Sequence, residues 1–335
     1  MKNNTYCTLL LSIIVNITSS TMQILYILST INLLINSASI HAFSISKRNN
    51  IMIFPQKVEI TKMSLSSTTT GSTKNEQLEV TKDGVYICKQ MPERLPRELK
   101  NTYYLLRHGQ SWGNVEGVIS SARSLATSEK HGLTPLGYEQ GRASAEELLK
   151  LIQTNNTSDN KNGQKLYFYS SPFARARQTA DACLEGLQSD ENKQVAKGLN
   201  LDIQENVTID YGLMERYFGR LDDAAIHTYA YVWPVDMFDP CHVGFEVESV
   251  AAVSTRLRET ILKIEENTIH RDGGDIIVLT SHADVLQILQ LYASGADNVG
   301  MFSSYRFTNG EVRLMGRTVD TLPEPQPLQP PKIGT

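Results

Sequence analysis

A short apolar and aromatic run leads directly into Arg107, His108 and Gly109 in the stretch YYLLRHGQSWGN. Such a run is typical of a buried strand, and an arginine and a histidine at its end are costly to bury unless something pairs with them. Because Arg107 keeps its charge, the natural partner is an anion. The glycine lets the backbone approach that anion, and Ser111 and Asn114 can add neutral hydrogen bonds. The stretch therefore predicts a phosphate pocket that contains a histidine.

Three further apolar runs end in residues that suit the same pocket. If the strands are parallel, their carboxyl ends meet at one edge of the sheet, where ligands collect. A single histidine at a strand end is usually a core residue whose ring nitrogens are hydrogen-bonded. Packing alone, however, does not explain several cationic side chains in one crevice. The residues are Ser170, Ser171 and Pro172 with Arg175 and Arg177 after the run at 165–171, Glu215 at the end of the run at 207–215, and His282 at the end of the run at 275–282.

These residue types suit the transfer of a phosphoryl group. A neutral imidazole such as that of His108 is a competent nucleophile toward phosphorus. Arg107 and Arg175 should keep His108 unprotonated, hold the phosphoryl oxygens and offset the charge that develops in transfer. His282 would be a second donor to the same oxygens. Glu215 is the candidate general acid for the leaving alcohol and then the base for water, which requires a raised pKa.

The elements that must position these residues alternate along the chain between strand-like and helical patterns. Thr134 followed by Pro135 is a good helix start, and Asn309-Gly310 is typical of a two-residue hairpin turn. The alternation predicts an α/β fold with a mainly parallel sheet that is covered on both faces. The predicted strands are 102–108, 165–171, 207–215 and 275–282, the predicted helices are 133–152, 172–187, 245–267 and 283–293, and the predicted hairpin is 305–316.

Composition places the chain among ordinary globular proteins. It has 335 residues, 41% of them hydrophobic and 20% charged, with a net charge of −4. Proteins that bind nucleic acid usually show a basic excess, so no nucleic-acid partner is expected. The cysteines show no zinc-site spacing, and one of them lies in the leader, so a disulfide framework is not expected, although a single bridge stays open. They are Cys7, Cys88, Cys183 and Cys241.

The first 42 residues are predicted to be a signal peptide. No charged residue lies between Lys2 and Lys47, the run at 24–35 has the length of a signal-peptide core, and small residues precede a plausible cleavage point after Ala42. An uncleaved leader that anchors the chain in a membrane, and a start at Met22, are the alternatives. A leader of this type is the one route by which we expect the chain to meet a membrane.

The segment 43–75 is rich in Ser and Thr, basic and poor in acidic residues, which is typical of a transit peptide. A signal followed by such a stretch resembles the bipartite presequences that send proteins into secondary plastids of algae. The alternative is a flexible linker in a protein that is secreted or stays in the endomembrane lumen. The catalytic domain is expected at 76–320, and a proline-rich tail at 321–335.

Six motifs along the chain resemble the histidine phosphatase superfamily, the group of cofactor-dependent phosphoglycerate mutases and their phosphatase relatives. The resemblance covers Thr102 to Gly316. LRHGQSWGN matches R-H-G-E-S-x-x-N with Gln110 in place of Glu, and LTPLGYEQG matches the L-T-x-x-G-x-x-Q that follows. SSPFARARQTA matches S-S-x-x-x-R-A-x-x-T-A, MERYFG matches E-x-x-F-G, VESVAAVSTRL matches an E-S block with a later Arg, and TSHADVLQIL matches an S-H-G block with Ala283 in place of Gly.

The resemblance implies a three-layer α/β/α sandwich of the phosphoglycerate mutase type. It also implies a phosphohistidine at His108, Glu215 as acid and base, and Arg175 rather than Arg177 as the phosphate ligand. Arg107, Asn114 and His282 complete the implied phosphate pocket. No metal and no cofactor are implied. One departure from the pattern is Asp223, which stands where many relatives have Gly.

The segment 220–249 favours a phosphatase over a mutase. The resemblance expects mutases to carry a long lid with paired arginines, whereas this segment contains only Arg220 among several acidic residues. A non-catalytic binding protein on the same fold would have lost His108, Glu215 or an arginine, and none is lost. The expected partner is a small phosphorylated substrate, and the oligomeric state stays open. Aromatic residues of the segment predict either a partly apolar lid or core, and they are Tyr229, Tyr231, Trp233 and Phe238, with Met237.

Overall fold

The computed structural model describes residues 79–80, 85–155, 163–268 and 274–328. All of them belong to a unit that spans Glu59–Thr335. The predicted signal peptide, the predicted transit-like linker and the last seven residues of the proline-rich tail lie outside the described residues. Among the helices of the described part, none combines the length and the apolar character needed to cross a bilayer.

The main sheet has five strands in the order β5-β4-β6-β3-β7. The pairs β3/β6, β4/β6 and β4/β5 are parallel, and only β7 runs antiparallel to its neighbour β3. Every residue of the central strand β6 is buried, because the strand is covered on both faces. The strands are β3 (Thr102–Arg107), β4 (Gln164–Ser170), β5 (Leu201–Ile209), β6 (Ile276–Ser281) and β7 (Val312–Leu314), and a separate antiparallel pair is formed by β1 (Glu79–Val80) and β2 (Tyr86–Ile87).

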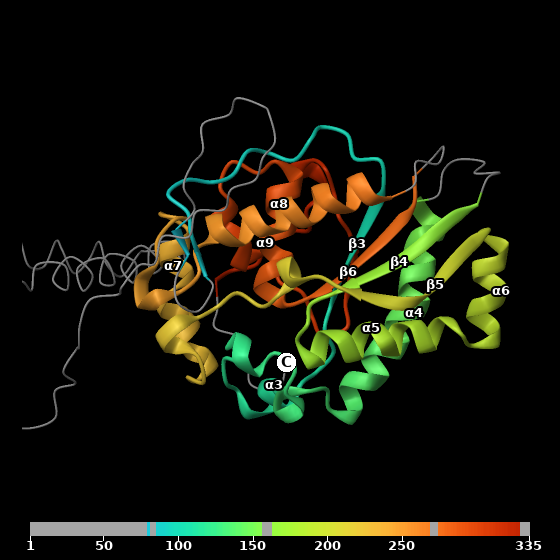
Figure 1. Cartoon of the computed structure of the whole chain (residues 1–335), viewed down its shortest axis with the longest axis horizontal. Helices are drawn as coiled ribbons and strands as arrows, with labels where there is room; N and C mark the ends of the chain where they lie inside the picture. Colours follow the sequence, from blue (N-terminus) through green and yellow to red (C-terminus); the bar gives the residue numbers. More distant parts are fainter. Residues whose placement is uncertain (1–78, 81–84, 156–162, 269–273, 329–335) are drawn as a thin grey trace, which may run out of the picture. The chain divides into compact units, whose positions relative to one another are not determined.

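The α-helices of the described residues lie on both faces of this sheet (Figure 1). They are α3 (Trp112–Glu116), α4 (Pro135–Asn155), α5 (Ala174–Leu187), α6 (Asp190–Gly198), α7 (Trp233–Asp236), α8 (Val250–Asn267) and α9 (Ala283–Ser294). Short 3-10 helices connect them, namely η1 (Arg123–Leu125), η2 (Glu129–His131), η3 (Tyr211–Leu213), η4 (Gly219–Leu221), η5 (Ile226–Tyr231), η6 (Gly244–Glu246), η7 (Val299–Ser304) and η8 (Val319–Thr321).

Two hydrophobic cores separate the layers. Tyr103 and Leu105 of β3 pack with α8 and α9, whereas Tyr104 and Leu106 pack with α4 and α5. Successive strand residues point to opposite faces, so one strand contributes to both cores. This arrangement confirms the predicted three-layer α/β/α sandwich with a mainly parallel sheet.

Helix α4 begins at Pro135 as predicted, and the Gly137 N–H donates to Thr134 Oγ1 over 3.1 Å. The apolar residues of this helix differ in exposure between its two ends. Leu136 is 46% exposed, whereas Leu148 and Ile152 are buried. The helical repeat of about 100° per residue places Leu136 almost opposite Ile152, so the two side chains do not share a face.

The predicted strand at 207–215 was wrong in its bounds. Strand β5 begins at Leu201 and ends at Ile209, and the chain then turns through η3. The Asp210 side chain starts that turn by accepting from the Gly212 N–H over 2.8 Å. Glu215 therefore lies several residues beyond the strand, on the segment that follows the 3-10 turn.

The predicted hairpin at 305–316 was also wrong. Only β7 is a strand there, and it pairs with β3. The Asn309-Gly310 turn is bound to the end of β3 instead. Asn309 Nδ2 and the Gly310 N–H both donate to the carbonyl oxygen of His108, over 3.1 and 3.3 Å. The turn therefore supports the backbone next to the candidate site.

Two further helices begin later than predicted. Helix α8 begins at Val250, later than predicted, because the Ser249 hydroxyl accepts from the Ala252 N–H over 3.1 Å and caps it. Helix α5 begins at Ala174, so Pro172 lies just before its first turn. Helix α6 and the start of β5 had no predicted counterpart.

The insertion, residues 220–249, divides its aromatic side chains between core and surface. Trp233 is buried and stacks on Tyr229 with ring centroids 4.7 Å apart. Tyr231 and Phe238 are 50% and 64% exposed. Asp223 has a φ of 63°, a conformation that glycine adopts freely, which gives a physical reason why the motif resemblance expects glycine at this position.

A buried ion pair anchors the insertion. Both Nη atoms of Arg216 lie 2.7 Å from the Asp236 oxygens, and both side chains are fully buried. We expect Asp236→Ala to lower the free energy of unfolding by about 3–5 kcal/mol, because it leaves a buried guanidinium without its main counter-ion. Urea denaturation measures the change. The matched control is Asp202→Ala, which removes an exposed partner of Lys165 at 3.9 Å and should cost about 1 kcal/mol or less. Equal losses in the two variants would contradict this account of the anchor.

Candidate active site

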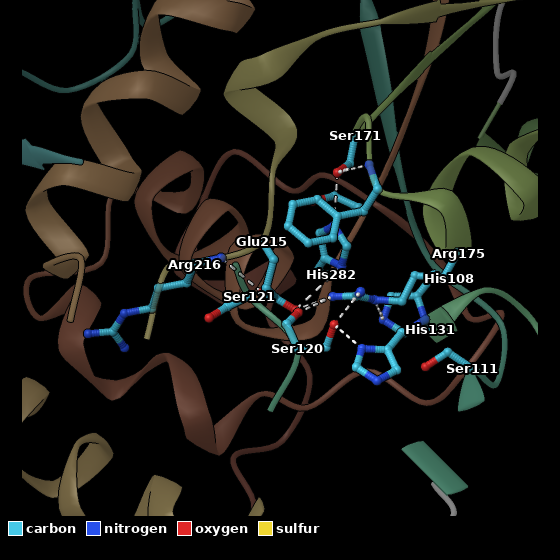
Figure 2. A network of polar contacts seen from close by, with 12 residues as sticks. His108, Ser111, Ser120, Ser121, His131, Ser171, Arg175, Glu215, Arg216 and His282 are labelled. Carbon is cyan, nitrogen blue, oxygen red and sulfur yellow. Dashed lines mark hydrogen bonds and ion pairs between the residues drawn. The ribbon is translucent and has the colours of Figure 1, made fainter. Parts of the chain in front are cut away.

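His108 and His282 lie side by side because the strands that precede them are neighbours. In the parallel pair β3/β6, Arg107 is opposite Ser281 at the ends of the two strands, and each histidine is the residue that directly follows its strand. Their ring centroids are 5.2 Å apart. Arg175 reaches the same place from the first turn of α5. Together with Glu215 these side chains form what we call the strand-end cluster, His108, Arg175, Glu215 and His282 (Figure 2).

The imidazole of His108 is buried and oriented by its own backbone. Its Nδ1 lies 2.7 Å from the Gly109 carbonyl oxygen, which can only accept, so Nδ1 carries the proton. The lone pair is then on Nε2, which accepts from Arg175 Nε over 3.3 Å. Burial, and then the charges of Arg175 and Arg107, hold the His108 pKa well below its usual value. His108 is therefore neutral, with its free nitrogen directed into the cluster.

The guanidinium of Arg175 occupies the middle of the cluster. Its Nη2 lies 3.4 Å from Glu215 Oε2 and donates to the Ser120 carbonyl oxygen over 2.9 Å. The Phe173 ring packs against it, 4.9 Å from the guanidinium carbon. Because Arg175 is buried and has only donors, its position is suited to the oxygens of a bound phosphoryl group.

The carboxyl group of Glu215 lies between two donors. Its Oε2 is 3.4 Å from Arg175 Nη2 and 3.4 Å from His282 Nδ1. Burial raises the pKa of Glu215, and the nearby charges of Arg175, Arg256 and Arg107 oppose that rise without cancelling it. A carboxyl group with a raised pKa can carry a proton and return it, as a general acid and base must.

His282 is held from behind by a serine. Its Nε2 lies 2.9 Å from Ser171 Oγ, and that oxygen also accepts from the Phe173 N–H over 3.3 Å. If the Ser171 hydroxyl proton goes to Nε2, the His282 proton is on Nδ1 and faces Glu215. Burial, and then the charge of Arg175, lower the His282 pKa well below its usual value. The ring is therefore a neutral donor directed into the cluster.

The remaining predicted residues surround this cluster. Arg107 donates from Nη1 to the Phe307 carbonyl oxygen over 2.6 Å. Ser111 and Asn114 form a reciprocal cap at the start of α3, in which the Asn114 N–H donates to Ser111 Oγ and the Ser111 N–H donates to Asn114 Oδ1. The cap engages Oδ1, so Nδ2 is the part of Asn114 that can donate to an anion. A phosphate contact from Ser111 stays a prediction, since its hydroxyl is bonded to Asn114.

Several neighbours of the cluster were not found from the sequence. Ser120 contacts Arg175, and His131 contacts Ser120, but neither residue belongs to any of the motifs found in the sequence. Ser120 lies in a loop and His131 ends the short 3-10 helix η2, and neither setting has a periodicity that marks a buried position. Asn309 was identified only as a turn residue. Arg177 lies outside the cluster, 3.6 Å from Glu129, as the motif resemblance implied.

The charges around the cluster favour an anion over a metal ion. His108, Glu215 and His282 offer nitrogen and oxygen atoms within 4.8 Å of one another, which is a donor set that metals use. The Arg175 guanidinium, however, lies within 3.4 Å of both His108 and Glu215. A second cation at the same place would be repelled, whereas an anion would be attracted.

Comparison with known proteins gives a family match over most of the described residues. The family model described as histidine phosphatase superfamily (branch 1) matches residues 103–321, which is more than half of the chain. The phosphoglycerate mutase-like protein AT74H of Arabidopsis thaliana is 31% identical over 91 residues, which cover 27% of this chain and 28% of that protein. The chain thus matches less than a third of the length of that relative.

Two solved mycobacterial structures are similar to the chain. Mycobacterial hydrolase 1 has 20% sequence identity and a TM-score of 0.45, with 63% of this chain and 89% of that chain covered. The mycobacterial glucosyl-3-phosphoglycerate phosphatase in complex with VO3 has 18% identity and a TM-score of 0.46, with 63% and 90% covered.

Proposed function

Because this chain belongs to the histidine phosphatase superfamily (branch 1), we propose that it is a metal-independent phosphomonoesterase that works through a phosphohistidine on His108. The observation that carries the proposal is the orientation of His108. Its Nδ1 is committed to the Gly109 carbonyl, and its free Nε2 faces Arg175 Nε at 3.3 Å. That nitrogen is therefore placed to attack the phosphorus of a phosphoryl group held by the arginine.

In the first step, the His108 Nε2 lone pair attacks phosphorus and the bond from phosphorus to the ester oxygen breaks. The leaving oxygen takes the proton of Glu215, so an alcohol departs and Glu215 becomes a carboxylate. The Nδ1 hydrogen bond to the Gly109 carbonyl stabilises the positive charge that develops on the ring. Arg107, Arg175 and His282 donate to the phosphoryl oxygens, which offsets negative charge in the transition state.

In the second step, the Glu215 carboxylate removes a proton from water, and the resulting oxygen attacks phosphorus. The bond between phosphorus and Nε2 breaks, its electron pair returns to His108, and inorganic phosphate leaves. Glu215 is protonated again and His108 is neutral, so the cycle closes without a metal or an organic cofactor. The raised pKa of Glu215 supports its alternation between these two roles.

The insertion supports hydrolysis over mutase activity. Its one arginine, Arg220, pairs with Glu246 over 3.5 Å and lies over the Phe245 ring. The adjacent Arg216 is fully buried and committed to Asp236. The insertion therefore presents one half-exposed guanidinium, that of Arg220, and no pair of arginines that could hold a second anionic group of a substrate, which a mutase must do. The proposed substrate is therefore a small phosphomonoester.

For the location of the enzyme we propose the plastid, reached by the secretory route, or else the secreted or endomembrane fraction. The proposal rests on the composition of residues 1–75 alone, which lie outside the described residues. Microscopy of the tagged full-length chain tests it, and retention of the tag in the cytosol would contradict both alternatives.

The proposed function is tested by phosphate release from a panel of phosphosugars, simple phosphomonoesters and phosphopeptides in excess chelator. We expect turnover that is unchanged by the chelator, because no step of the proposed cycle uses a metal. The same protein is then given 3-phosphoglycerate with its bisphosphate primer. Interconversion without phosphate release would favour the mutase, and no reaction in either assay would favour a non-catalytic binding protein.

A further inference from the structure

His131 lies behind the strand-end cluster and is linked to Arg175 through one serine. Its ring is buried, with 7% of the residue exposed, and its Nδ1 lies 2.7 Å from Ser120 Oγ. That oxygen is 3.4 Å from Arg175 Nη1, and the Ser120 carbonyl oxygen accepts from Arg175 Nη2 over 2.9 Å. The contacts form a chain from His131 to Ser120 to Arg175, which Figure 2 shows as dashed lines.

The direction of the hydrogen bonds in this chain follows from the donor inventory. A guanidinium can only donate, so Ser120 Oγ must accept from Arg175. The Ser120 hydroxyl still has its own proton to donate to its other partner, His131 Nδ1. The Glu116 carboxylate, which can only accept, lies beside His131 Nε2 and favours the ring proton there, so we assign Nδ1 as the unprotonated nitrogen. The His131 proton is consequently on Nε2, on the side where the Glu116 carboxylate lies 3.6 Å away. A neutral His131 thus fixes Ser120 Oγ as an acceptor.

The surroundings of His131 favour this neutral form. Burial, and then the charges of Lys130 and Arg175, lower its pKa, and the carboxylates of Glu116 and Asp223 oppose that effect more weakly. Its ring also packs against Gly113 of α3. A Cβ atom at Gly113 would lie only 3.6 Å from Cγ of the His131 ring, which shows how close the two residues are. Packing therefore holds the ring in place while its Nδ1 faces Ser120.

We propose that His131 is a positioning residue for phosphoryl transfer, which holds Ser120 Oγ as an acceptor and thereby orients the Arg175 guanidinium. The inference rests on the proposed function, since it assigns Arg175 to the phosphoryl oxygens. Without the acceptor at Ser120 Oγ, the Nη1 edge of the guanidinium loses a partner, and the orientation of its plane then depends on the contacts with His108, Glu215 and the Ser120 carbonyl alone. Misorientation would weaken contacts that count most in the transition state.

The test compares His131→Ala, His131→Asn and His131→Gln in the full chain. We expect His131→Ala to lower kcat/KM by about 10–100-fold, as loss of a supporting hydrogen bond often does. The Asn side chain places an acceptor at the position of Nδ1, so His131→Asn should stay within about threefold of wild type. His131→Gln places its amide near the Nε2 position and should resemble His131→Ala. The exposed His227, changed to Ala, is the matched control and should have no effect.

A second variant separates positioning from a merely structural role. Ser120→Ala should lose about as much as His131→Ala, and the double variant should lose no more than the larger single loss, because both changes break one chain of contacts. Orthovanadate, which resembles the transition state, should lose more affinity than inorganic phosphate in His131→Ala. A structural role would lower both affinities together, in step with the melting temperature.

The outcomes distinguish this inference from the proposed function. Equal losses in His131→Asn and His131→Ala, multiplying losses in the double variant, or a change of less than about twofold in His131→Ala would overturn the positioning role. If His131→Ala does not fold, the comparison of Asn with Gln decides. If the wild-type protein releases no phosphate, the proposed function fails, and the vanadate and phosphate affinities measured by calorimetry still test the chain of contacts.

Discussion

Replacement of His108 with alanine is expected to lower the rate of phosphate release by about 10⁴-fold or more. The proposed cycle has no other nucleophile, because the neighbouring His282 is directed by Ser171 on one side and Glu215 on the other. Steady-state kinetics with the best ester of the panel measure the loss. The variant should still bind inorganic phosphate, since both pocket arginines remain, so a loss of activity with retained binding identifies a chemical role.

The result that would contradict this role is activity in His108→Ala within about tenfold of wild type. Direct attack of water on the substrate would then be the better mechanism. A variant that loses phosphate binding and melts at a much lower temperature would instead indicate that loss of the acceptor for the Arg175 Nε–H disturbs folding. In that case His108→Asn, which keeps a polar group at the site, is the variant to compare.

Replacement of Glu215 with glutamine should have a large effect that depends on the leaving group. For alkyl phosphates we expect kcat to fall by about 10²–10⁴-fold, because glutamine cannot supply the proton that the leaving alcohol requires. 4-Nitrophenyl phosphate leaves as a stable anion and needs no acid, so the first step should stay fast. Hydrolysis of the phosphohistidine still needs the base. Stopped-flow absorbance should therefore show a burst of one nitrophenolate per site, followed by slow turnover.

The pH dependence of the same variant tests the direction of two pKa shifts. Burial raises the Glu215 pKa, and burial with the two arginines lowers the His108 pKa. The active form has Glu215 protonated and His108 neutral. For alkyl phosphates, kcat/KM should therefore rise as pH increases through the low His108 pKa and fall as pH increases through the raised Glu215 pKa. Glu215→Gln should lose the alkaline limb. An alkaline limb that persists in Glu215→Gln would assign it to another group.

The sequence was sufficient to predict the parts of the site that follow buried strands. β3 and β6 are apolar runs that stop at a polar residue, so His108 and His282 could be placed at the same edge of one sheet before their distance was known. Parallel pairing of these neighbours then brings the rings to 5.2 Å. Glu215 was correctly grouped with them, although β5 lies at the edge of the sheet and its half-exposed residues hid where it ends.

The parts that depend on contacts between loops could not be predicted in the same way. Ser120 contacts Arg175 from a loop and His131 contacts Ser120 from the end of η2, and no periodic pattern connects these residues. The antiparallel pairing of β7 with β3 and the hydrogen bond from Asn309 to the His108 carbonyl are likewise long-range contacts, the latter across 201 positions of sequence. The predicted turn at Asn309-Gly310 does form, since the Glu311 N–H donates to the Thr308 carbonyl oxygen over 3.3 Å, but the residues before it form no strand, so there is no hairpin.

The most direct test of the central claim is to identify the phosphorylated residue. Glu215→Gln is mixed with 4-nitrophenyl phosphate, quenched in alkali during the slow phase, and digested for mass spectrometry under conditions that preserve bonds between phosphorus and nitrogen. The mechanism predicts one phosphoryl group per protein, located on His108, stable in alkali, lost in acid and absent from the double variant His108→Ala/Glu215→Gln. A phosphoryl group on any other residue, or none during a clear burst, would contradict it.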